Sequence, residues 1–280
     1  MYSLKSKEVS ELKRFMLLLV CMIIVAAASL MIYISDRGEA VPTGAPAHGS
    51  SHTVTDPASG KSEYVQSAGM PQNYIPAEEL TAPSVAEEKI IEYCQYPDYP
   101  TGCESASLYI LLQYYDIEVT MEEIVEALPK GPRPYEGANG VIYGADPEKE
   151  FVGDPTLSNS YGVFNQPIAE TANGFKDGAV AVNGISTFEI EKIVSNGVPL
   201  IAWVSMYPEK EPTVSRWYDY VTSEQITWVG GEHAVVVYGE ADGEYLISDP
   251  ITGEKGVLTE KELNTGLERY GGKIVYYPEE

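Results

Sequence analysis

The chain has 280 residues, 44% of them hydrophobic, which is enough to build a packed core and excludes a wholly disordered protein. It carries 42 acidic and 18 basic side chains, a formal net charge of −24, so nucleic acid and anionic lipid head groups are not expected as partners of its folded part. Three cysteines are too few for a disulfide scaffold, and no Cys/His cluster with metal-ligand spacing occurs, so neither a metal nor another cofactor is expected.

The first feature in chain order is an uncharged apolar run over residues 15–35. About 20 apolar residues in a helix span the hydrocarbon core of a bilayer, so the run is predicted to enter the membrane. Lysines and an arginine in residues 1–14 place the N-terminus in the cytoplasm and the rest of the chain outside it. The run is either an anchor or a signal cleaved near Gly38-Glu39-Ala40, which would release a secreted protein.

Residues 36–85 are rich in Ala, Gly, Pro, Ser and Thr without helical or strand periodicity, and we interpret them as a flexible linker. Periodic segments begin near residue 86, so the folded domain is predicted to cover 86–280. A helix is expected from Cys103 to about Tyr115, and three further helices are expected to begin at capping boxes, where a Ser or Thr is followed three residues later by Glu. These boxes are Thr120 with Glu123, Ser186 with Glu189, and Thr259 with Glu262.

Residues 130–165 contain many Gly, Pro, Asn and Asp residues, and we expect them to form a wall of the substrate groove and no core element. A short helix is expected near 167–173. Strands are predicted at 179–182, 198–204, 233–238, 244–248, 255–258 and 273–277. Helices in the first part and an antiparallel sheet in the second indicate an α+β fold.

Cys103 is the first candidate for chemistry, because it opens the predicted helix after Thr101-Gly102. Unpaired amides and the helix dipole at such a position are expected to lower the pKa of the thiol and make it a nucleophile. The alternative is a small buried core residue.

His233 is the one histidine of the predicted domain, and Asp249 ends the next strand, 16 residues later. If the connecting hairpin is centred on Ala241, the two side chains lie directly opposite each other and can form a hydrogen bond. A turn at Asp242-Gly243 instead displaces that pairing by about three residues. His233 would be the base, Asp249 would orient its ring, and Gln95 with the Cys103 backbone N–H would stabilise an oxyanion.

The run from Cys94 to Ser105, CQYPDYPTGCES, resembles the signature of cysteine peptidase family thirty-nine-like domains. These domains are papain-like relatives of the bacteriocin-processing double-glycine peptidases. Further matches occur at Gly231-Glu232-His233, at Ser248-Asp249-Pro250, and in a loop with FVGDP at 151–155 and SYG at 160–162. The resemblance implies a papain-like fold, with Cys103 as nucleophile, His233 as base, Asp249 as orienting residue and Gln95 in the oxyanion hole.

The sequence therefore predicts an extracytoplasmic, membrane-tethered thiol hydrolase that acts on peptide or amide bonds of an unidentified peptide or protein. Two alternatives remain open: an acyl-transferring thiol enzyme, and a catalytically silent binding or adhesion module whose groove is lined by some of the 21 tyrosines. A disulfide between Cys94 and Cys103 would silence the nucleophile, whereas an unpaired Cys94 would leave it free. The sequence does not indicate the oligomeric state.

Overall fold

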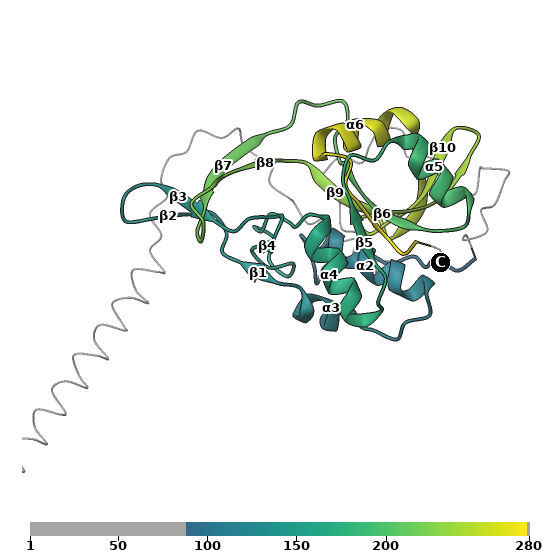
Figure 1. Ribbon diagram of the computed structural model, residues 1–280, viewed down its shortest axis with the longest axis horizontal. Coiled ribbons are helices and arrows are strands. Elements are labelled where there is room, and N and C mark those ends of the chain that lie inside the picture. The colour runs from purple at the N-terminus through teal and green to yellow at the C-terminus, as the bar shows by residue number, and fades with distance from the viewer. Residues whose placement is uncertain (1–87, 279–280) are drawn as a thin grey trace, which may run out of the picture. The chain divides into compact units, whose positions relative to one another are not determined.

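The computed structural model describes residues 88–278 of the chain (Figure 1). The predicted cytoplasmic segment, apolar run and linker, residues 1–85, lie outside these described residues. Within 88–278, no helix combines the length and the apolar character needed to cross a membrane.

Helix α2 (Cys103–Tyr114) begins at the predicted cysteine, and it is buried on almost every side. Helix α3 (Met121–Ala127) begins at the Thr120 and Glu123 capping box, in which each residue's side chain accepts a hydrogen bond from the other's backbone N–H. The Ser186 and Thr259 boxes form in the same way at α5 (Thr187–Ser195) and α6 (Glu260–Tyr270). All three predicted capping boxes are confirmed.

A six-stranded antiparallel sheet forms the centre of the fold, with strand order β11-β10-β9-β6-β12-β5. Successive side chains of a strand point to opposite faces of the sheet, and here the apolar side chains lie on both faces. Helices cover both faces and keep these side chains from water. Helices α2 and α4 (Asn165–Phe175) pack on one face, and α5 and α6 pack on the other. The strands are β5 (Val180–Val182), β6 (Leu200–Ser205), β9 (Glu232–Ala241), β10 (Glu244–Asp249), β11 (Glu254–Thr259) and β12 (Ile274–Tyr276).

The β9–β10 hairpin turns at Asp242-Gly243, and the turn centred on Ala241 is wrong. Both turn residues have positive φ (54° and 84°), the conformation that a two-residue hairpin turn of this kind requires. The register then shifts between Leu246 and Ile247, because Leu246 pairs with Gly239 whereas Ile247 pairs with Val237. Tyr238 is thus one extra residue, a β-bulge in β9.

Residues 130–165 are not excluded from the core, contrary to the expectation. Phe151, Val152 and Val163 are completely buried, although the strands here are very short. The reason is that these apolar side chains occur in pairs between turns, Phe151 with Val152 and Val163 with Phe164, so they fill the core without a repeating pattern. The strands are β1 (Lys130–Gly131), β2 (Tyr135–Glu136), β3 (Ile142–Gly144) and β4 (Phe151–Val152).

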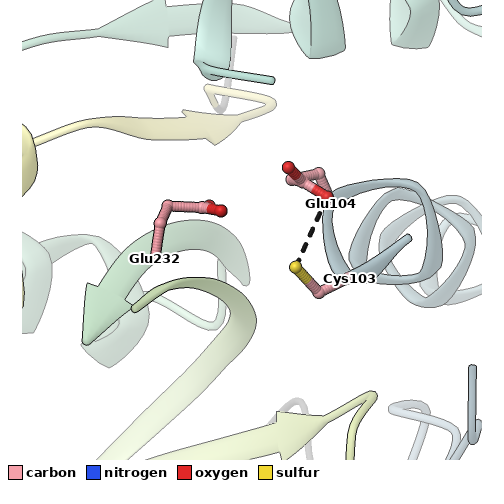
Figure 2. Close-up of side chains that lie close together, drawn as sticks. All are labelled: Cys103, Glu104 and Glu232. Atoms are coloured by element: carbon pink, nitrogen blue, oxygen red, sulfur yellow. Dashed lines mark hydrogen bonds between the residues drawn. The ribbon is translucent and has the colours of Figure 1, made fainter. Parts of the chain in front are cut away.

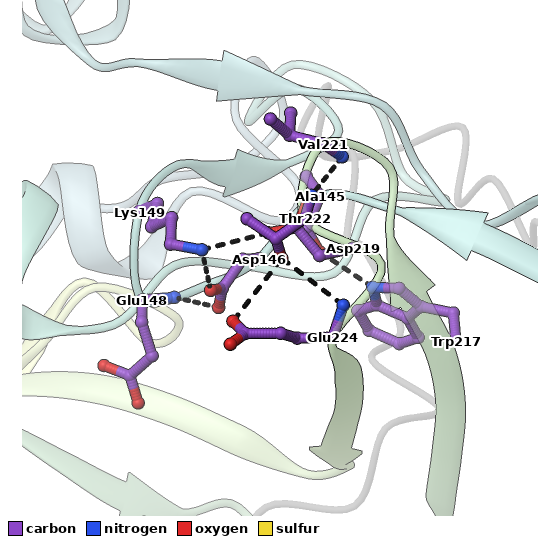
Figure 3. A network of polar contacts seen from close by, with 9 residues as sticks. All are labelled: Ala145, Asp146, Glu148, Lys149, Trp217, Asp219, Val221, Thr222 and Glu224. Carbon is purple, nitrogen blue, oxygen red and sulfur yellow. Dashed lines mark hydrogen bonds and ion pairs between the residues drawn. The ribbon is translucent and has the colours of Figure 1, made fainter.

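A second hairpin, β7 (Val214–Asp219) with β8 (Gln225–Val229), was not among the predicted strands. It joins β2 and β3 in a four-stranded sheet, and its two tryptophans are buried beneath it. Figure 3 shows the polar contacts between β7 and residues 145–149. Lys149 pairs with Asp219 of β7 at 3.0 Å and with Asp146 at 2.9 Å. Trp217 Nε1 donates to the Ala145 carbonyl at 2.7 Å.

Candidate active site

Cys103 occupies the first position of α2, directly after Gly102. A side chain at Gly102 has no room, because a Cβ atom there would lie 2.9 Å from Tyr99 Cβ. The Cys103 thiol is buried and donates to Glu104 Oε2 at 3.4 Å.

The expected lowering of the Cys103 pKa is wrong. Burial raises the pKa of the thiol well above its usual value, and the neighbouring carboxylates of Glu104 and Glu232 raise it further. The backbone N–H of Ala234 partly offsets these effects by favouring the thiolate. In this arrangement Cys103 is a protonated thiol, and ionisation requires a change in its surroundings.

His233 and Asp249 form a hydrogen-bonded pair, with His233 Nε2 2.8 Å from Asp249 Oδ1. Burial alone would raise the pKa of Asp249, but His233 and the N–H groups of Ile251 and Thr252 hold it below the usual value. Asp249 is therefore an ionised acceptor, the state in which it can fix the orientation of the His233 ring.

Helix α2 and strand β9 bring the cysteine and the histidine into one region of the fold. One turn after Cys103, Ser107 Oγ donates to the carbonyl of Ala234 at 3.0 Å, and Ala234 directly follows His233. His233 is 95% buried, and its Nδ1 atom has no hydrogen-bond partner among the described residues. Within this part of the chain no hydrogen bond joins that ring to the Cys103 thiol, which points to Glu104.

Gln95 lies on the loop that leads to α2 and is buried. Its backbone N–H donates to the Pro250 carbonyl at 2.8 Å, so the loop is fastened to the residue that follows Asp249. The side-chain Nε2 donates to the Tyr99 carbonyl at 3.0 Å, and the second hydrogen on Nε2 remains for another acceptor. Burial raises the pKa of Tyr96, the residue after Gln95, and the negative charge of Cys103 as thiolate would raise it further.

Two buried glutamates beside the cysteine were not among the predicted site residues. Glu104 is fully buried, and its Oε1 accepts the Val163 N–H at 2.7 Å. Glu232 precedes His233 on β9, and Figure 2 shows its carboxylate pointing toward Cys103 and Glu104. Burial raises the pKa of Glu104 to about 7, although hydrogen bonds from its own N–H and from Val163 oppose the effect. The sequence offered one signal that could have identified them: Glu104 directly follows Cys103, and Glu232 directly precedes His233.

The two cysteines among the described residues, Cys94 and Cys103, are both free. Cys94 is exposed, and its sulfur contacts the Ile251 carbonyl at 3.8 Å. The Cys94–Cys103 disulfide remains a prediction for an oxidised form.

Comparisons with known proteins agree on one family. The model of the Peptidase_C39 like family matches residues 87–272. An uncharacterized protein of Bacillus subtilis strain 168, YvpB, is 28% identical over 158 residues, which cover 55% of this chain and 60% of YvpB. The chain thus spans less than two thirds of the length of that relative. A crystal structure described as that of a C39-like peptidase from Bacillus anthracis superposes with a TM-score of 0.60, at 23% identity, over 70% of this chain and 97% of that one.

Proposed function

Because the chain belongs to the Peptidase_C39-like family, we propose that it is a cysteine peptidase that hydrolyses peptide or amide bonds through Cys103, His233 and Asp249. The observation that carries the proposal is the 2.8 Å contact between His233, near the start of β9, and Asp249, at the end of β10. The contact occupies Nε2 of the ring, so the buried and unpartnered Nδ1 remains for the proton of the thiol.

The first step is transfer of the thiol proton. In the structure the thiol donates this proton in a hydrogen bond to Glu104. The Cys103 side chain must therefore turn from Glu104 to His233 Nδ1 before the proton can pass to the histidine. Hydrogen bonds of catalytic groups are often long in a free enzyme and shorten only when substrate binds. Protonation leaves an imidazolium whose Nε2–H donates to the ionised Asp249.

The thiolate then attacks the carbonyl carbon of the substrate, and the imidazolium protonates the departing amine. Water releases the acyl group from Cys103 in a second half-reaction, in which His233 acts as base again. Acceptance of the acyl group by an amine in place of water would make the same machinery an acyl transferase.

The oxyanion formed in each half-reaction would accept hydrogen bonds from the Cys103 backbone N–H and from Gln95 Nε2. Support for Gln95 comes from its burial and from the fixed position of its loop, whose backbone N–H is bonded to the Pro250 carbonyl. A donor held in place before the reaction stabilises the developing charge without reorganisation.

Outside the cytoplasm is the location we propose for this domain. The support is in the sequence: basic residues precede the apolar run over 15–35, and a Pro- and Ser-rich stretch separates that run from the folded domain. The substrate would then be an extracytoplasmic peptide or protein.

Thiol labelling and peptide cleavage test the proposal on the full chain. Wild type should react with an iodoacetamide probe at Cys103, resolved by tandem mass spectrometry, and should cleave members of a peptide library. Cys103→Ala should abolish cleavage, and His233→Ala should slow labelling of Cys103 but leave labelling of Cys94 unchanged. Equal cleavage by wild type and Cys103→Ala would refute the proposal.

A binding module is the second candidate, favoured by a row of tyrosines on the four-stranded sheet. Tyr135, Tyr143 and Tyr218 are cross-strand neighbours, with ring centroids 6.3 and 6.4 Å apart, and two of them are exposed. Such a row can stack against a ligand. An intact fold that binds peptides without cleaving any of them would favour this candidate.

A further inference from the structure

Three potential metal ligands meet beside the nucleophile. The Cys103 sulfur and one carboxylate oxygen each from Glu104 and Glu232 all lie within 4.8 Å of one another, and all three residues are buried (Figure 2). They come from two elements, the first turn of α2 and the start of β9.

Glu232 supplies an independent reason to expect a cation there. Its side chain points toward the other two residues, the residue is 92% buried, and its Oε1 has no hydrogen-bond partner among residues 88–278. A buried carboxylate oxygen without a donor is costly unless a proton or a cation accompanies it.

The surroundings hold Glu104 ready as a ligand. The Val163 N–H is bonded to its Oε1 and thereby fixes the carboxylate, with Oε2 directed to the thiol. Gly162 keeps the space between the carboxylates free, since a Cβ there would lie 2.5 Å from Glu104 Oε1 and 3.1 Å from Glu232 Oε2.

Size and donor type select the cation. The three residues are at most 8% exposed and their ligand atoms lie within 4.8 Å of one another, so the site suits a ligand as compact as a single metal ion. A thiolate with two carboxylates suits Zn²⁺ better than Mg²⁺ or Ca²⁺, which prefer oxygen alone. Ligands of tetrahedral zinc are roughly 3.5 Å apart. The Cys103 sulfur is already 3.4 Å from Glu104 Oε2, and no pair of ligand atoms in the cluster needs to close by more than about 1 Å.

We propose that Cys103, Glu104 and Glu232 form a zinc site that holds the enzyme inactive, an inference that rests on Cys103 being the nucleophile of the proposed peptidase. Zinc would accept one electron pair from the Cys103 sulfur and one from each carboxylate, and the thiol proton, with any proton held by the two carboxyl groups, would pass to solvent. The sulfur could then neither turn to His233 nor attack a carbonyl. Removal of zinc would restore the free thiol, so the site would act as a reversible switch.

The test measures zinc affinity and thiol protection in the full chain, without reference to cleavage. Zinc is titrated against a chromophoric chelator, and the rate of iodoacetamide labelling is followed at Cys103 and at Cys94. Zinc should slow labelling of Cys103 by at least about tenfold and affect the exposed Cys94 much less. Glu232→Gln, a change of nearly equal shape, should label at least as fast as wild type without zinc, because a carboxylate that raises the pKa of the Cys103 thiol is gone, and it should bind zinc at least about tenfold more weakly.

Glu126→Gln, an exposed change on α3, is the matched control and should behave as wild type. Circular dichroism confirms that each variant is folded, and Glu104→Gln repeats the test if Glu232→Gln is not. Absence of zinc protection in wild type, or equal zinc affinity of Glu232→Gln and wild type, would overturn the inference. Either result leaves the proposed peptidase standing if wild type still cleaves peptides, whereas loss of cleavage with intact zinc protection would refute the peptidase alone.

Discussion

His233 and Asp249 lie on the same face of the sheet, two residues away from being direct cross-strand partners. The register Ser248 with Val236, continued by one residue, sets Asp249 beside Val235. Without the bulge at Tyr238 the displacement would be three residues, and the two side chains would point to opposite faces. The bulge thus makes the 2.8 Å hydrogen bond possible.

Asp249→Asn tests whether this pair matters for the reaction. The amide removes the charge that stabilises the imidazolium and allows the wrong ring tautomer, so kcat/KM on a cleaved peptide should fall by about 10²- to 10⁴-fold. Asp242→Asn is the matched control, an identical chemical change at an exposed turn of the same hairpin. Unchanged kcat/KM in Asp249→Asn would show that Asp249 has no part in catalysis.

Gln95→Ala should separate turnover from thiol chemistry. Loss of an oxyanion donor should lower kcat by about 10²- to 10³-fold, while Cys103 is alkylated at the wild-type rate because alkylation forms no oxyanion. Gln113→Ala loses a comparable amide-to-carbonyl bond, Nε2 to Ile117 O at 3.1 Å, and serves as the control. A parallel fall in alkylation and turnover would instead indicate a structural role for Gln95.

Asp219→Asn should change the dependence of stability on pH. Burial would raise the pKa of Asp219, but the Val221 N–H at 2.7 Å and Lys149 at 3.0 Å hold it below the usual value. The stability from this ionised group is present above about pH 4, the unfolded pKa of Asp, and is lost as pH falls through the lower folded pKa. Wild type should therefore be more stable than Asp219→Asn at pH 6 in urea denaturation, and the difference should shrink below pH 4. For exposed Asp242→Asn the difference should stay small at every pH.

Thr259→Ala tests the cap of α6. The Thr259 hydroxyl accepts the Glu262 N–H, and its removal should lower the free energy of unfolding by about 1 kcal/mol in urea denaturation. Thr265→Ala, within the same helix and half-buried, should be nearly neutral since Ala is the better helix former. Equal effects of the two changes would show that the cap contributes nothing.

Local rules predicted most of the helices and the central strands of this domain. Capping boxes and the end of a helix at a glycine or proline depend on neighbours in the chain, so Thr120, Ser186 and Thr259 could be identified from the sequence alone. The β7–β8 hairpin was missed, although Trp217 and Trp228 each lie between exposed or half-buried residues, because its connecting loop, residues 220–224, lacks glycine.

Interactions between distant segments could not be derived in this way. The pairing of β9 with β10 depends on the bulge at Tyr238. No residue pattern predicts this bulge, because a tyrosine also suits an ordinary buried strand. Likewise, the state of the Cys103 thiol depends on Glu232, 129 residues later in the chain, and helix position alone predicted the opposite direction of its pKa.

The three tryptophans of the chain, Trp203, Trp217 and Trp228, are all buried. Trp228 stacks on Phe164 with centroids 5.5 Å apart and lies against Gly162, next to the Glu104 carboxylate. Indole emission depends on the polarity of the surroundings, so the protein carries an intrinsic optical probe close to Glu104, the residue that follows Cys103. Ligand binding near Cys103 can consequently be followed by fluorescence, with no label attached and before any substrate is identified.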